Sequence, residues 1–87
     1  MTTIEAIQAV VDERLEGRTA VFEDNLENCN CVKICWGDYY GRVAWSEDER
    51  GYGTEHWADI VKLRTWGVVS EMLKLKQSKE RAAEAGG

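Results

Sequence analysis

The sequence predicts a small α+β domain in which a three-stranded antiparallel meander sheet packs against two helices. The chain has 87 residues, a length that supports one hydrophobic core. Two apolar segments flank the pair Gly37-Asp38, which is typical of a β-hairpin loop. Apolar residues also recur at helical spacing near both ends of the chain. We expect residues 1–76 to form the single domain and residues 77–87 to form a charged, fraying C-terminal tail.

The N-terminal segment predicts a helix that begins after Thr2 and ends near Glu16. Thr2 and Glu5 have the spacing of a capping box, which satisfies free N–H groups at a helix start. Gly17 favours an end to the helix because glycine readily adopts positive φ. One apolar stripe follows the helical period and consists of Ile4, Ile7, Val10, Val11 and Leu15.

The next segments predict the meander. Residues 19–23 are rich in β-prone types and are expected to form the first strand. Residues 29–36 and 39–45 then form a hairpin around a two-residue loop. Its register pairs Trp36 with Tyr39, Ile34 with Gly41, Val32 with Val43 and Asn30 with Trp45. This register gathers the large apolar side chains on one face, and a shift of one residue would break that face.

The C-terminal segment predicts a long helix that begins after Thr54 and continues to about Ala83. The preceding residues 46–49 also resemble a capping box, but two glycines follow closely, so we expect a turn or a short helical stub. Gly67 in the long helix predicts a kink or a close contact, because glycine costs about 1 kcal/mol relative to alanine in a helix.

The long helix carries two apolar stripes. The first consists of Trp57, Val61, Val68, Met72 and Leu75, and the second consists of Trp66, Val69 and Leu73. Together they form an arc wider than one small sheet can cover. Either the first helix also packs on this arc, or the second stripe is an interface between copies of the chain.

The order α-β-β-β-α resembles the topology of double-stranded RNA-binding domains. In those domains the second helix begins with basic residues that contact phosphates, whereas residues 54–59 here read Thr-Glu-His-Trp-Ala-Asp. The resemblance therefore implies a fold and does not imply RNA binding. Without a strand at 19–23 the order would be α-β-β-α, which resembles some phage head-joining proteins.

Charge and composition restrict the function classes. The net charge is −5, with 13 acids and 5 bases in residues 1–59 and 3 acids and 6 bases in residues 60–87. This acidic balance argues against direct nucleic-acid binding, which needs clustered Lys and Arg. The absence of a long apolar run and of a signal-peptide pattern, together with an odd number of cysteines, leads us to expect a cytoplasmic protein with no membrane contact.

The three cysteines and the single histidine are candidates for a zinc site. Cys29, Cys31, Cys35 and His56 are all zinc-compatible residues. On one strand, however, Cys31 and Cys35 would lie about 13 Å apart, whereas zinc ligands lie within roughly 4 Å of one another. We therefore expect no cofactor, and a zinc-stabilised module remains an alternative hypothesis.

Acidic residues are expected to gather at one end of the sheet. In a meander, the turn between the first two strands lies at the same end as the exit of the third strand. This end, called the acidic end below, contains Glu23, Asp24, Glu27, Glu47, Asp48 and Glu49. Tyr40 and Tyr52 are further candidate contact residues, because tyrosine is common at interface centres.

These observations favour a non-enzymatic protein-binding module over an enzyme, because we find no persuasive acid–base or nucleophile set. In size and charge the chain is similar to phage-encoded inhibitors of host enzymes, including anti-CRISPR proteins. That likeness implies an inhibitor that blocks a basic surface of a nucleic-acid-handling enzyme in the cytoplasm of a bacterial host. The main alternative is an oligomeric assembly protein, such as a homodimer, that associates through Trp66, Val69 and Leu73.

Overall fold

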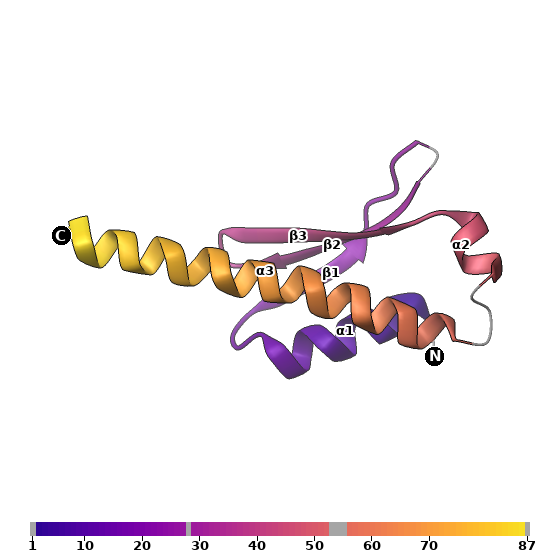
Figure 1. The fold of residues 1–87 in the computed structure, drawn as a ribbon, viewed down its shortest axis with the longest axis horizontal. Helices are drawn as coiled ribbons and strands as arrows, with labels where there is room; N and C mark the ends of the chain where they lie inside the picture. The colour runs from indigo at the N-terminus through magenta and orange to yellow at the C-terminus, as the bar shows by residue number, and fades with distance from the viewer. Residues whose placement is uncertain (1, 28, 53–55, 87) are drawn as a thin grey trace.

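The computed structural model describes residues 2–27, 29–52 and 56–86, and the predicted α+β architecture is confirmed. The elements are α1 (Thr3–Arg14), β1 (Thr19–Glu23), β2 (Asn30–Trp36), β3 (Tyr39–Trp45), α2 (Glu47–Tyr52) and α3 (Trp57–Gly86). The strands form one antiparallel sheet in the order β1-β2-β3. Helices α1 and α3 lie on the same face of this sheet, and α3 continues past the ends of the strands (Figure 1). The segment 19–23 is a strand, so the shorter α-β-β-α order does not apply.

Helix α1 begins as the capping pattern predicts and ends earlier than expected. The Thr2 hydroxyl accepts a hydrogen bond from the Glu5 backbone N–H at 3.1 Å and donates one to the Glu5 carboxylate at 3.0 Å. The helix ends at Arg14, two residues before the predicted end, because Leu15 already has an extended backbone (φ −107°, ψ 123°). Leu15 is thereby turned into the core. Gly17 follows with φ 99°, the left-handed conformation that glycine adopts at low cost.

The β2–β3 hairpin has the predicted register. All four expected pairs are present, from Trp36 opposite Tyr39 at the turn to Asn30 opposite Trp45 at the far end. Gly37 has φ 60°, as a tight two-residue hairpin loop requires. Because side chains alternate along a strand, this register places the predicted apolar set on the inner face, toward the helices.

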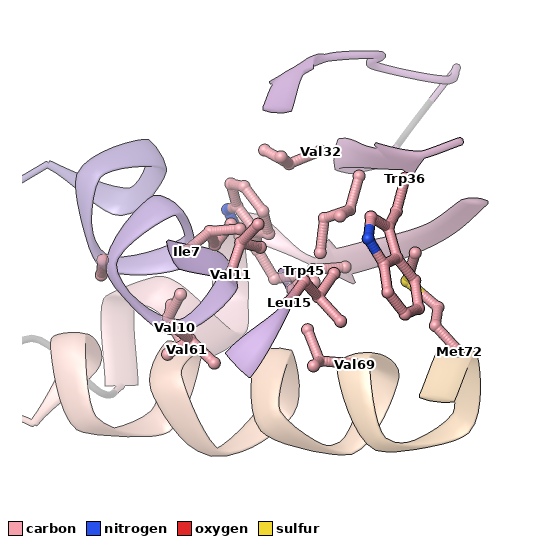
Figure 2. Packing of buried hydrophobic residues seen from close by; sticks show 13 residues of the cluster. Ile7, Val10, Val11, Leu15, Val32, Trp36, Trp45, Val61, Val69 and Met72 are labelled. Carbon is pink, nitrogen blue, oxygen red and sulfur yellow. The ribbon is translucent and has the colours of Figure 1, made fainter. Parts of the chain in front are cut away.

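The core lies between the inner face of the sheet and the two helices (Figure 2). It is made from the apolar stripe of α1, alternate residues of β2 and β3, and one side of α3. Helix α3 packs tightly against β3 at Gly41, where an added Cβ would lie 2.5 Å from Val68 Cγ1 and 3.0 Å from Met72 Sδ. The missing side chain of Gly41 therefore sets the distance between α3 and β3.

The short segment after β3 forms a true helical stub. In α2 the Ser46 hydroxyl accepts from the Glu49 backbone N–H at 3.1 Å, and the Glu49 carboxylate accepts from the Ser46 backbone N–H at 2.9 Å. This reciprocal pair is a complete capping box. The cap expected at Thr54, and Glu55 after it, lie outside the described residues.

Helix α3 runs without interruption through Gly67 and ends at Gly86, three residues beyond the predicted end. The prediction of a close contact at Gly67 is wrong, because an added Cβ there would meet no atom within 4 Å. Gly67 therefore lowers the helix propensity without a packing benefit from the described residues.

Candidate functional site

The acidic end is assembled from two segments that lie against each other. These are the β1–β2 loop and the corner between β3 and α2. The side-chain amide of Asn30 donates a hydrogen bond to the Glu47 carboxylate at 2.6 Å. Between the segments is a shallow depression of about 440 Å³, lined by Asn25, Leu26, Cys29, Asn30, Ser46, Glu47 and Asp48. The meander thus brings the two groups of acids to one end of the sheet, as its topology requires.

The β1–β2 loop is held in place by its own hydrogen bonds. The Asp24 backbone N–H donates to the Cys31 carbonyl at 2.9 Å, and the Cys31 N–H donates to the Asn25 side-chain carbonyl at 3.0 Å. Leu26 and Cys29 exchange two backbone hydrogen bonds, both of 3.1 Å. These bonds continue the antiparallel pairing of β1 and β2 as far as Leu26 and Cys29, and Glu27, the residue after Leu26, is exposed.

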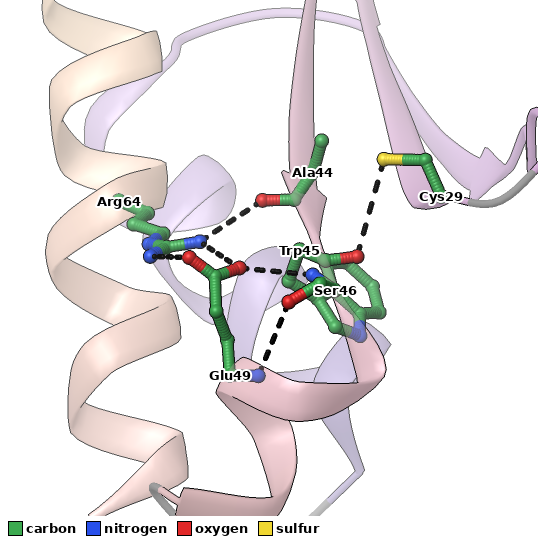
Figure 3. A network of polar contacts seen from close by, with 6 residues as sticks. All are labelled: Cys29, Ala44, Trp45, Ser46, Glu49 and Arg64. Atoms are coloured by element: carbon green, nitrogen blue, oxygen red, sulfur yellow. Dashed lines mark hydrogen bonds and ion pairs between the residues drawn. The ribbon is translucent and has the colours of Figure 1, made fainter.

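One carboxylate of the acidic end, Glu49, is engaged inside the chain (Figure 3). It pairs with both terminal nitrogens of Arg64, at 2.8 and 3.1 Å, and Arg64 also donates to the Ala44 carbonyl at 3.1 Å. The hydrogen bonds from Arg64 and from the Ser46 N–H lower the pKa of Glu49 to about 2. Glu49 therefore links α2 to α3 and to the edge of β3, so its role is structural.

Asp24 is engaged as well, through an ion pair of 3.2 Å between its carboxylate and Arg42 Nε. The hydrogen bond that Arg42 donates to the Asp24 carboxylate raises the pKa of Arg42. Four exposed carboxylates of the acidic end then remain without an ion pair among the described residues: Glu23, Glu27, Glu47 and Asp48.

Of the two tyrosines, Tyr40 is not brought into the acidic end. Tyr40 lies on the outer face of the sheet, 57% exposed, with Lys33 Nζ 4.7 Å and Arg42 Cζ 5.3 Å from its ring centroid. Tyr40 lies four residues before Ala44 in β3, which places it about 13 Å along the strand from the acidic end. Tyr52 is the last residue of α2, and its side chain lies outside the described part of the structure.

The zinc-compatible residues do not converge. Cys31 and Cys35 project from β2 four residues apart, while His56 precedes α3. The Cys29 thiol makes weak contacts with the Asn30 carbonyl at 3.5 Å and the Trp45 carbonyl at 3.9 Å. Within the described ranges, no three His, Cys, Asp or Glu side chains are placed to hold a metal ion. Burial also raises the pKa of the Cys31 thiol, which disfavours the thiolate form that binds metals or attacks substrates.

The second apolar stripe of α3 does not form one continuous surface. Val69 is only 1% exposed and belongs to the core, and Leu73 is half-buried against it. Trp66 alone of the three predicted residues is exposed, at 49%. The interface prediction is therefore wrong for Val69, because α3 is rotated so that this residue faces the sheet and α1.

A different apolar pair is exposed on α3. Leu63 is 74% exposed and lies one helical turn before Trp66, and both residues line an open groove between α1 and α3. Leu63 belongs to neither predicted stripe, although its i,i+3 spacing from Trp66 is a signal in the sequence.

No protein-family model matches the chain, and no curated protein or solved structure is significantly similar to it. Among the helices in the described ranges, none combines the length and apolar character that crossing a membrane requires. We therefore infer function from the charges and exposed side chains of this chain alone.

Proposed function

We propose that the protein is a non-enzymatic binding module that engages a Lys- and Arg-rich protein surface through its acidic end. The observation that carries this proposal is a set of four exposed carboxylates at one end of the sheet that form no ion pair with any described residue: Glu23, Glu27, Glu47 and Asp48. Oriented charges on an ordered frame attract a basic partner at long range and lose little conformational freedom on binding.

The partner surface that fits best is one that normally binds nucleic acid. Such surfaces cluster Lys and Arg to neutralise phosphates, and a group of fixed carboxylates offers the same sign of charge. The module then acts as an inhibitor that competes with nucleic acid for a basic groove, in the manner of a phage-encoded anti-defence protein in a bacterial cytoplasm. This binding should weaken as the salt concentration rises, because dissolved ions screen the attraction between exposed charges.

The test is a charge reversal that leaves the structural carboxylates intact. The first variant carries Glu23→Lys, Glu27→Lys and Asp48→Lys, and it keeps Glu47 because this carboxylate accepts the hydrogen bond from Asn30. The matched control carries Glu71→Lys, Glu80→Lys and Glu84→Lys, which changes the net charge equally on the exposed side of α3. Glu49 is left unchanged, because its loss would break the contact with Arg64 described above.

Each protein is used to capture partners from a bacterial lysate, and the captured complex is then challenged with double-stranded DNA. We expect the wild type and the α3 control to retain a basic partner that DNA displaces, and the acidic-end variant to lose it. Circular dichroism checks that both variants are folded. A partner that the folded acidic-end variant still binds would show that the carboxylates are not the contact.

A further inference from the structure

A small pocket lies at the start of α1, beside the acidic end. Its volume is about 350 Å³, and the residues that line it include Thr3, Glu23, Asn25, Trp45 and Arg50. Helices α1 and α3 run in the same direction, and both begin at this end of the molecule (Figure 1). The lining residues come from the start of α1, the end of β1, the end of β3 and α2, so the pocket exists only in the folded chain.

The indole N–H of Trp45 is a buried donor without an acceptor. Trp45 is only 9% exposed, and its Nε1 is the one buried side-chain nitrogen or oxygen of the described residues that has no hydrogen-bond partner. The indole groups of Trp36 and Trp57 each donate to an oxygen of another segment, at 2.7 and 3.1 Å. The Trp45 nitrogen lies on the side of its ring turned away from Arg64 (Figure 3). Because this nitrogen is shielded from bulk water, an acceptor reaches it through the pocket that Trp45 lines.

Further donors line the same pocket. The backbone N–H groups of Thr3 and Ile4 have no carbonyl four residues earlier within α1, and the helix start carries a partial positive charge of about +0.5. The side-chain carbonyl of Asn25 accepts from the Cys31 N–H at 3.0 Å, so its NH₂ group is left as a donor. Arg50 adds a full positive charge from α2. Together these groups favour an oxyanion, because charged and oriented N–H donors bind anionic oxygens strongly.

Glu23 gives the pocket a negative charge as well, so the site carries both signs. This carboxylate disfavours a doubly negative ligand such as phosphate, and it attracts a cationic group placed beside the oxyanion. An α-amino acid has a carboxylate and an ammonium group separated by one carbon atom, which matches both signs. The volume is at the small end of the range of ligand pockets, which suits a molecule of that size.

We propose that this pocket binds a free α-amino acid. The carboxylate of the ligand accepts hydrogen bonds from Trp45 Nε1, from the first N–H groups of α1 and from Arg50, and the ammonium group donates to Glu23. This inference goes beyond the proposed function, because the ligand is a small molecule and not a protein. Glu23 belongs to both sites, but the experiment below uses the isolated protein, so either proposal can fail without the other.

The indole N–H resonance of Trp45 is a direct reporter of this site. Its ¹H–¹⁵N signal is assigned through its backbone neighbours, and each standard L-amino acid is titrated into the full chain up to about 10 mM. We expect at least one amino acid to shift the Trp45 signal in a saturable way. The signal of Trp36, whose N–H already donates to the Glu16 carbonyl, should stay in place. The absence of a saturable shift with every amino acid would overturn the proposal.

Ligand analogues test the two charges separately. For the amino acid that binds, the amide lacks the carboxylate and the N-acetyl derivative lacks the ammonium group. Each should bind at least about tenfold more weakly, because each loses a hydrogen bond to a charged group. An analogue that binds as tightly as the amino acid would overturn the assignment of both charges.

Matched variants place the site at this pocket. Arg50→Gln and Glu23→Gln should each weaken binding by about tenfold, and both residues are exposed, so the fold should be kept. The control is Arg18→Gln, an exposed arginine that lies outside this pocket, and it should keep the wild-type affinity. Unchanged affinity in Arg50→Gln, or an equal loss in Arg18→Gln, would contradict the proposal.

Discussion

The inner and outer faces of the sheet are built from alternating residues of the same three strands, yet they depend on different interactions. Ile34 on the inner face is completely buried under the helices, so its contribution comes from burial and packing. Tyr40 on the outer face is largely exposed, and its neighbours are Lys33 and Arg42 of the same sheet. The comparison indicates that the inner face supplies the packed core, while the exposed side chains of the outer face contribute little to stability. Cys31 is an exception, because it is buried although it lies on the outer face.

The largest expected effect follows from truncating one residue on each face. Ile34→Ala should lower the free energy of unfolding by about 2–5 kcal/mol, because it removes buried methyl groups and leaves a cavity. Tyr40→Ala should cost no more than about 1 kcal/mol, the scale of an exposed cation–π contact. Urea denaturation of both variants measures the difference. Equal losses for the two substitutions would contradict the distinction between the faces.

Gly41 and Gly67 sharpen the comparison further. Gly41→Ala should lower the free energy of unfolding by about 1–3 kcal/mol, because the new methyl group would overlap Val68 and Met72 on the inner face. Gly67→Ala should raise it by about 0.5–1 kcal/mol, because the space there is open and alanine favours the helix. Thermal unfolding should therefore show shifts of opposite sign for the same chemical change.

The smallest effect is expected for the ion pair between Arg64 of α3 and Glu49 of α2. The pKa of Glu49 falls from an ordinary value of 4.5 to about 2 in the folded chain, so the ionised carboxylate stabilises the fold. By linkage, this contribution is complete above about pH 4.5 and is lost as the pH falls toward 2. Glu49→Gln should therefore lose less stability than the wild type across this window.

Urea denaturation at several pH values between about 2 and 6 measures this difference. Glu84→Gln, at the exposed end of α3, is the control and should retain the wild-type pH dependence. An unchanged pH dependence in Glu49→Gln would show that the pair with Arg64 is not maintained in solution.

The hairpin and the gathering of acids could be predicted from sequence because both depend on local rules. The loop at Gly37 and the alternation of apolar residues determine the register, and the register determines which faces and ends residues share. The partners of the acids could not be predicted in this way. Glu49 and Arg64 are separated by 15 positions and an intervening loop, so their contact depends on how α3 returns to the sheet.

The burial pattern of α3 was also beyond sequence reasoning. Helical spacing places Trp66 and Val69 on one stripe, but it does not define which part of a wide apolar arc meets the sheet. That rotation depends on the close approach at Gly41 and on the position of α1, both of which are tertiary features. The same features leave Leu63 and Trp66 at the surface.

The parallel direction of α1 and α3 has an electrostatic consequence for the acidic end. The start of α1 lies beside Glu23, Asn25 and Arg50, and the hydrogen bond between Trp57 and Thr3 brings the start of α3 to the same place. Each helix N-terminus carries a partial positive charge of about +0.5 from its aligned peptide dipoles. Two such backbone charges at one end partly offset the mutual repulsion of the nearby carboxylates.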